Sequence, residues 1–172
     1  MSAKRITVTA VLTAVALTIF IIEAQIPPLV PVPGIKLGLA NVITLFAIFT
    51  LGKRDAFIIL ILRIILGSVF AGSVVSCIYS LAGGMMCFAL MSVCSLFLKD
   101  NMIWCVSVIG AIGHNIGQIL VAVIITQTIQ VMWYLPALMI SAVVTGVFTG
   151  LVTQQILKHG NGKIKSMIGA WK

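Results

Sequence analysis

Apolar residues run almost unbroken along this chain, and short polar or proline-rich interruptions divide them into six segments. No Lys, Arg, Asp or Glu occurs between Met102 and Leu157, and Arg63 alone interrupts the stretch from Ala56 to Leu98. Each stretch is far longer than the roughly 20 residues that cross a bilayer once. The pattern predicts an all-α polytopic membrane protein, with residues 1–172 as one integral membrane domain. The six expected transmembrane helices are 6–24, 36–51, 56–70, 74–98, 102–126 and 136–157.

The expected helix ends rest on residues that interrupt helices. Pro27 and Pro28 follow the first helix, and proline inside a helix removes a backbone donor and clashes with the preceding turn. Pro136 suits the first turn of the last helix, where its missing N–H costs nothing. The other breaks fall at GKRD (52–55), AGS (71–73) and KDN (99–101).

Composition and charge support a membrane protein and give it an orientation. The chain is 61% apolar and 8% charged, whereas about a quarter of a soluble domain is charged. Lys36, at the start of the second predicted helix, is the only basic residue on the predicted outer side. Basic loops favour the cytoplasm, so we expect a multi-pass cell-membrane protein with both termini cytoplasmic. The net charge of +8 then reflects topology and the lipid bilayer as partner, and needs no nucleic acid. The inner basic residues are Lys4, Arg5, Lys53, Arg54, Lys99, Lys158, Lys163, Lys165 and Lys172.

Arg63 is the first candidate site residue, because it falls about 12 Å into the third predicted helix at about 1.5 Å per residue. A cation at that depth costs on the order of 2.5–3.5 kcal/mol and must face protein or water. The chain has three acids, and Asp55 and Asp100 sit on predicted cytoplasmic turns beside basic residues. Glu23 is therefore the acid of the outer half. Glu23 forms a structural ion pair with Arg63 or Lys36, or the three line a site for a small anionic or zwitterionic molecule.

A second polar cluster lies in the fifth predicted helix, in the sequence GAIGHNIGQ (110–118). His114 and Gln118 are four residues apart and share a helix face, with Asn115 adjoining. Asn41, early in the second helix, could join them. These side chains bridge helices, as polar groups in membrane bundles commonly do, or they bind the polar groups of a ligand.

Small residues recur at helical spacing and predict close helix packing. Such faces are expected at Gly110, Gly113 and Gly117, at Ala142, Gly146 and Gly150, and at Gly83 and Gly84. Ala10 and Ala14 form a flat strip on the cytoplasmic half of the first helix. This strip faces either the bundle or another membrane protein.

The chain resembles a known family over nearly its whole length. The six spans and the Ala10-x-x-x-Ala14 spacing resemble the substrate-binding S component of energy-coupling-factor transporters. The sequences IPPLVPVPGIKLGLANVITLFAI, GKRDAFIILILRIILGSVFAG and SLAGG resemble more narrowly the Gx transporter family, often labelled heptaprenyl diphosphate synthase component I. Within these, PGIKLGLAN is the most specific part.

This resemblance implies uptake of a small, anionic, vitamin- or prenyl-like compound. The proline-rich first outer loop would close over the binding cavity, and Lys36, at the expected start of the second helix, would point a cation at the substrate. The implied partners are a transmembrane coupling subunit, docked at Ala10 and Ala14, and cytoplasmic ATPases. The chain itself has no G-x-x-x-x-G-K-[ST] phosphate loop.

The sequence argues against catalysis by this chain. Prenyl diphosphate synthases hold Mg²⁺ with clustered aspartates, since Mg²⁺ takes hard oxygen ligands. This chain has two aspartates, Asp55 and Asp100, far apart. Its four cysteines show no metal-ligand or dithiol spacing, so we expect no metal or cofactor. The alternative to transport is a non-catalytic membrane subunit or scaffold associated with isoprenoid or quinone metabolism.

Overall fold

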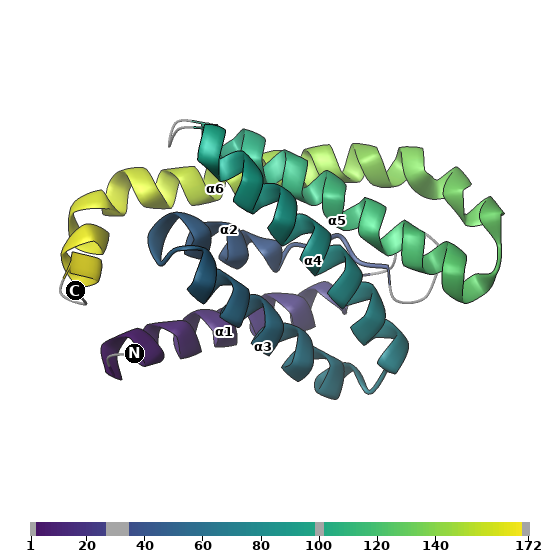
Figure 1. The fold of residues 1–172 in the computed structure, drawn as a ribbon, viewed down its shortest axis with the longest axis horizontal. Helices are drawn as coiled ribbons and strands as arrows, with labels where there is room; N and C mark the ends of the chain where they lie inside the picture. The colour runs from purple at the N-terminus through teal and green to yellow at the C-terminus, as the bar shows by residue number, and fades with distance from the viewer. Residues whose placement is uncertain (1–2, 27–34, 99–101, 170–172) are drawn as a thin grey trace.

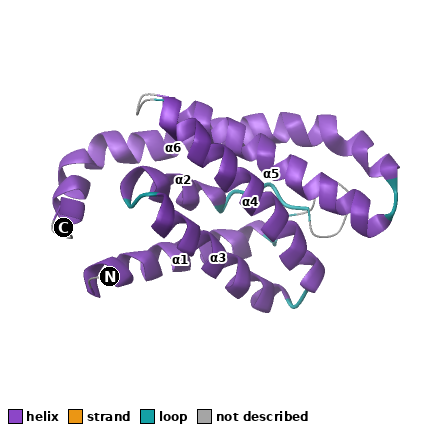
Figure 2. Cartoon of the chain, viewed as in Figure 1, coloured by secondary structure: helices purple, strands orange, loops and turns teal. Residues whose placement is uncertain are grey.

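The structure is a computed structural model that describes residues 3–26, 35–98 and 102–169, with the backbone alone for 161–169. Within these ranges every regular element is helical (Figure 2). The expected proline-rich loop, residues 27–34, lies outside the described residues, as does Asp100. The elements are α1 (Ala3–Glu23), α2 (Asn41–Thr50), α3 (Lys53–Ala71), α4 (Val74–Phe97), α5 (Ile103–Thr126), the 3₁₀ helix η2 (Ile129–Tyr134) and α6 (Leu135–Gly169).

The described helices form a membrane bundle, as the apolar pattern predicts. Helices α1, α4 and α5 and the stretch Ile129–Gly160 are long and apolar enough to cross a bilayer. Helix α2 has only 10 residues. Helix α3 has 19 residues but carries Lys53, Arg54 and Asp55 in its first turn as well as Arg63. Large apolar side chains such as Val69 and Phe97 are more than two-thirds exposed on the outside, where lipid would cover them.

Most predicted helix ends lie within three residues of the observed ones. The break between α3 and α4 is confirmed: Gly72 ends α3 with φ +59°, and the Ser73 side chain caps α4 by accepting from Ser76 N–H. Two ends are wrong. Helix α6 continues to Gly169 rather than 157, and α2 begins at Asn41 rather than 36.

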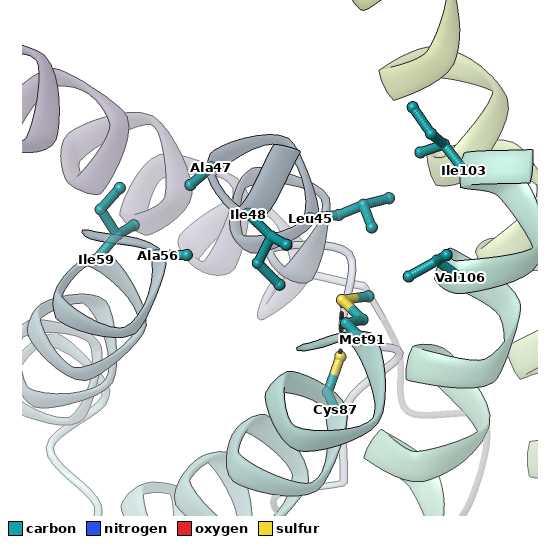
Figure 3. Close-up of a cluster of buried hydrophobic side chains, with 9 residues drawn as sticks. All are labelled: Leu45, Ala47, Ile48, Ala56, Ile59, Cys87, Met91, Ile103 and Val106. Carbon is teal, nitrogen blue, oxygen red and sulfur yellow. Dashed lines mark hydrogen bonds between the residues drawn. The ribbon is translucent and has the colours of Figure 1, made fainter. Parts of the chain in front are cut away.

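Helix α2 lies at the centre of the bundle. It contacts all five other described α-helices, while α1 packs mainly on α3, and α5 packs along both α4 and α6 (Figure 1). Buried apolar side chains from α2, α3, α4 and α5 meet around it (Figure 3). This core cluster consists of Leu45, Ala47, Ile48, Ala56, Ile59, Cys87, Met91, Ile103 and Val106.

The predicted small-residue faces lie where helices approach most closely. An added Cβ would stand 2.7 Å from the Ala82 carbonyl oxygen at Gly117, and 2.5 Å from Trp104 Cα at Gly150. These contacts are with backbone atoms, which cannot move as a side-chain end does. The glycines therefore permit the tight α4–α5 and α5–α6 packing, as expected.

A partly buried ion pair ties α1 to α3. Arg5 Nε donates to Asp55 Oδ2 at 2.7 Å, and the Asp55 carboxylate is 1% exposed. The expectation that Asp55 stands on a turn beside Arg54 is wrong, because α3 begins at Lys53 and buries Asp55 against α1. Only the fold brings Arg5 to this carboxylate.

We predict that Arg5→Ala lowers the free energy of unfolding by on the order of 2 kcal/mol, because it leaves the Asp55 carboxylate buried and unpaired. The loss is below that of a fully buried pair, since the Arg5 side chain is 34% exposed. The double variant Arg5→Ala/Asp55→Asn should regain part of the loss. Thermal unfolding in detergent measures both, and a double variant less stable than Arg5→Ala would contradict this account.

Candidate functional site

A non-helical segment, residues 35–40, lies inside the helix bundle just before α2. Such backbone is tolerated at membrane depth only where protein groups satisfy its N–H and C=O groups. Two side chains do so here. The Lys36 backbone N–H donates to Gln118 Oε1 on α5 at 3.2 Å, and the Gly38 N–H donates to Glu23 Oε1 on α1 at 2.6 Å. These contacts explain why α2 starts late.

Gly38 is required in this segment by its backbone and by its neighbours. Its φ of +80° is a conformation that L side chains rarely adopt. An added Cβ would stand 2.7 Å from His114 Cδ2 and 2.9 Å from Asn41 Nδ2. The backbone at Gly38 therefore lies directly against two of the predicted site residues.

Arg63, Asn41 and His114 form a continuous buried hydrogen-bond chain across α3, α2 and α5. Arg63 Nη2 donates to Asn41 Oδ1 at 2.7 Å, and Asn41 Nδ2 lies 3.1 Å from His114 Nδ1. A guanidinium can only donate, so the Asn41 atom that meets it is the oxygen. The Asn41 amide nitrogen then donates to His114 Nδ1, which places the proton of neutral His114 on Nε2.

Three buried donors at this hydrogen-bond chain and beside it have no partner among the residues that the structure describes. They are Arg63 Nε, His114 Nε2 and Gln118 Nε2. The Gln118 side-chain oxygen accepts the Lys36 N–H, which leaves the Gln118 amide nitrogen as the third unused donor. Buried polar groups are normally paired, and those that are not call for an explanation. Because all three unused groups are donors, they suit a ligand rich in hydrogen-bond acceptors.

Two cations and one acid accompany these donors without forming an ion pair. Among the described side chains the only ion pair is Arg5–Asp55, so the alternative in which Glu23 pairs with Arg63 or Lys36 is not observed. Lys36 Nζ instead lies 3.4 Å from the centre of the Phe20 ring, and Arg63 Cζ lies 5.9 Å from it.

Three other predicted residues lie apart from this cluster. Asn115 Nδ2 donates to the Leu138 carbonyl on α6 at 2.7 Å, which is the helix-bridging role that the sequence left open. Ala10 and Ala14 are exposed on α1, so their strip does not face the bundle.

The structure adds three residues that the sequence did not predict as part of the site. The Phe20 ring and the flanking glycines Gly83 and Gly84 all contact the cluster. An added Cβ at Gly83 would stand 2.8 Å from His114 Nδ1, and one at Gly84 would stand 3.7 Å from Arg63 Nη2. The glycine pair was predicted only as a packing face. The one sequence signal for its place in the site was that it lies in the predicted helix that follows the helix of Arg63.

These features define an integral membrane protein whose helices enclose a polar, donor-rich cluster at the start of a short central helix. The family model of heptaprenyl diphosphate synthase component I matches residues 12–156, so the chain belongs to that family. No curated protein and no solved structure matches the chain.

Proposed function

We propose that this protein is a membrane substrate-binding subunit for uptake of a small anionic compound, vitamin- or prenyl-like, energised by partner subunits. The observation that carries the proposal is the set of donors on Arg63, His114 and Gln118, beside the cations Arg63 and Lys36; within the described ranges these donors have no hydrogen-bond partner and neither cation forms an ion pair. A charged group without an ion pair is expensive at membrane depth, so its retention favours a functional role.

The polarity of the hydrogen-bond chain supports an anion over a neutral ligand. Carboxylate and phosphate oxygens accept hydrogen bonds only, and hydrogen bonds to charged groups are about twice as strong as neutral ones. The one acid of the site, Glu23, already accepts the Gly38 N–H through Oε1 at 2.6 Å.

The proposed orientation places both termini in the cytoplasm of a cell-membrane protein. Helix α1 begins and α6 ends at the same end of the bundle, where α2 also meets α3 (Figure 1). The basic residues Arg5, Lys53, Arg54 and Lys158 lie at this end, which supports a cytoplasmic assignment. The polar cluster then lies toward the outer half.

We further propose that the chain is non-catalytic and acts with a transmembrane coupling subunit and cytoplasmic ATPases. The exposed Ala10 and Ala14 strip offers the coupling subunit a flat helix face. Catalysis of prenyl elongation is disfavoured by the acids, because the Asp55 carboxylate is buried against Arg5 and cannot join a magnesium cluster.

Ligand-dependent thermal stabilisation of the purified protein tests the proposal. The panel is made of anionic vitamins, flavins and prenyl phosphates, each paired with an uncharged analogue. We expect an anionic member to raise the melting temperature and its uncharged partner to have little effect, since a ligand that binds only the folded state stabilises it. Equal stabilisation by the uncharged partners, or none by any compound, would count against uptake of an anion.

The family description favours a second candidate, a non-catalytic membrane subunit associated with isoprenoid or quinone metabolism. The words "component I" imply a partner subunit. This candidate predicts stable co-purification with a soluble prenyl synthase subunit and no response to small anions. The transport proposal predicts stabilisation by a small anion and no stable co-purification with a soluble prenyl synthase subunit.

A further inference from the structure

The Phe20 side chain is buried beside the polar cluster. The side chain is 3% exposed, and Lys36 Nζ lies 3.4 Å from its ring centre. The edge of the ring rests on Gly67 of α3, where an added Cβ would stand 2.8 Å from Phe20 Cε1. Gly67 follows Arg63 by one helical turn, so the ring is wedged against the helix that carries the buried arginine.

The position of the Lys36 ammonium on this ring is unexpected, because an acid lies close by. Glu23 is one turn after Phe20 on α1, and the Glu23 charge acts on Lys36. Nevertheless Lys36 forms no ion pair within the described part of the chain, and Glu23 Oε1 accepts the Gly38 N–H. A cation over an aromatic face is held by about 0.5–2 kcal/mol, depending on desolvation, which competes with a partly screened ion pair.

We propose that Phe20 is a positioning residue that holds the Lys36 ammonium away from Glu23, so that this cation stays available for the oxyanion of a ligand. An ion pair with Glu23 would balance the charge of Lys36 and occupy its ammonium hydrogens. The Phe20 ring leaves these hydrogens free to donate to ligand oxygens. The consequence for the ligand rests on the proposed function. The role of Phe20 in placing Lys36 stands without it.

The first test needs no ligand and follows the reaction of Lys36 with succinimidyl acetate, read by peptide mass spectrometry. The exposed Lys158 serves as the internal reference. In Phe20→Leu we expect Lys36 to react about fivefold more slowly, because pairing with Glu23 keeps its amine protonated. Adding Glu23→Gln should restore the rate, since the glutamine oxygen still accepts the Gly38 N–H but carries no charge.

Two further variants separate positioning from folding. Phe20→Tyr keeps an aromatic face and should react as the wild type does. Glu23→Gln alone should raise the Lys36 rate by less than it does in the Phe20→Leu background, because in the wild type the Glu23 charge acts on Lys36 without an ion pair. An unchanged or faster rate in Phe20→Leu, or a slow rate that Glu23→Gln does not restore, would overturn the proposal. A merely structural role for Phe20 would not be rescued by removing the Glu23 charge.

A second arm repeats the reaction with acetate or inorganic phosphate at constant ionic strength. We expect one of the two to protect Lys36 about fivefold in the wild type and not in Phe20→Leu. Protection by acetate alone indicates a carboxylate ligand, and protection by phosphate alone indicates a phosphate. Protection that persists in Phe20→Leu would overturn the role of Phe20. Protection by neither in the wild type would count against the proposed anion site, while the first arm still decides on Phe20.

Discussion

Replacing Arg63 by methionine should abolish the response to an anionic ligand while leaving the fold intact. We expect at least about a 30-fold loss of affinity, the usual result of removing one partner of a buried charged contact. The free energy of unfolding should change by less than about 1 kcal/mol. Removal of a membrane-buried cation relieves about 2.5–3.5 kcal/mol, which offsets the about 1–3 kcal/mol that Asn41 Oδ1 loses with its donor.

This pair of outcomes distinguishes a ligand-binding arginine from a structural one. Arg63 is 2% exposed and donates to Asn41 Oδ1 at 2.7 Å. Were this bond its whole purpose, Arg63→Met would unfold the protein at markedly lower temperature and spare any ligand affinity. Arg54→Met is the matched control, because Arg54 is exposed on the same helix and should change neither quantity. Calorimetric titration and thermal unfolding in detergent measure the two effects.

Gly38→Ala should have the second large effect, a loss of about 2–4 kcal/mol in the free energy of unfolding together with loss of ligand binding. About 1–2 kcal/mol comes from placing a Cβ on a left-handed backbone. The remainder comes from the side chains that the Cβ would meet, His114 and Asn41, at 2.7–2.9 Å. Those same side chains carry the hydrogen-bond chain, so the substitution should disturb the site directly.

Gly72→Ala provides a matched control for the backbone contribution. Gly72 has a left-handed backbone with φ +59°, and an added Cβ there would meet nothing within 4 Å. Its loss should be limited to about 1–2 kcal/mol, with ligand binding retained. Thermal unfolding of both variants gives the difference that belongs to the contacts with His114 and Asn41. Equal losses in the two variants would show that segment 35–40 does not press against the cluster.

The sequence pointed to most of the individual residues of the candidate site, but it did not predict which of them contact one another. Arg63, His114 and Gln118 stand out because polar groups are costly in apolar helices, and the fold buries all three. Asn41 was expected as an accessory residue and instead links Arg63 to His114. Phe20 gave no signal, because an aromatic residue in an apolar helix matches its surroundings.

The sequence by itself determined the membrane class, the helical segments, the break at Gly72 and the faces where helices pack closely. These properties depend on local hydrophobicity, glycine and proline, which act within a few residues. Only the tertiary structure decided where α2 begins, because Glu23 and Gln118 reach segment 35–40 from distant parts of the chain. It likewise decided that Asp55 pairs with Arg5, and that Lys36 lies on Phe20 rather than on an acid. Partners for buried polar groups are chosen by proximity in the folded bundle, and spacing along the chain does not encode that proximity.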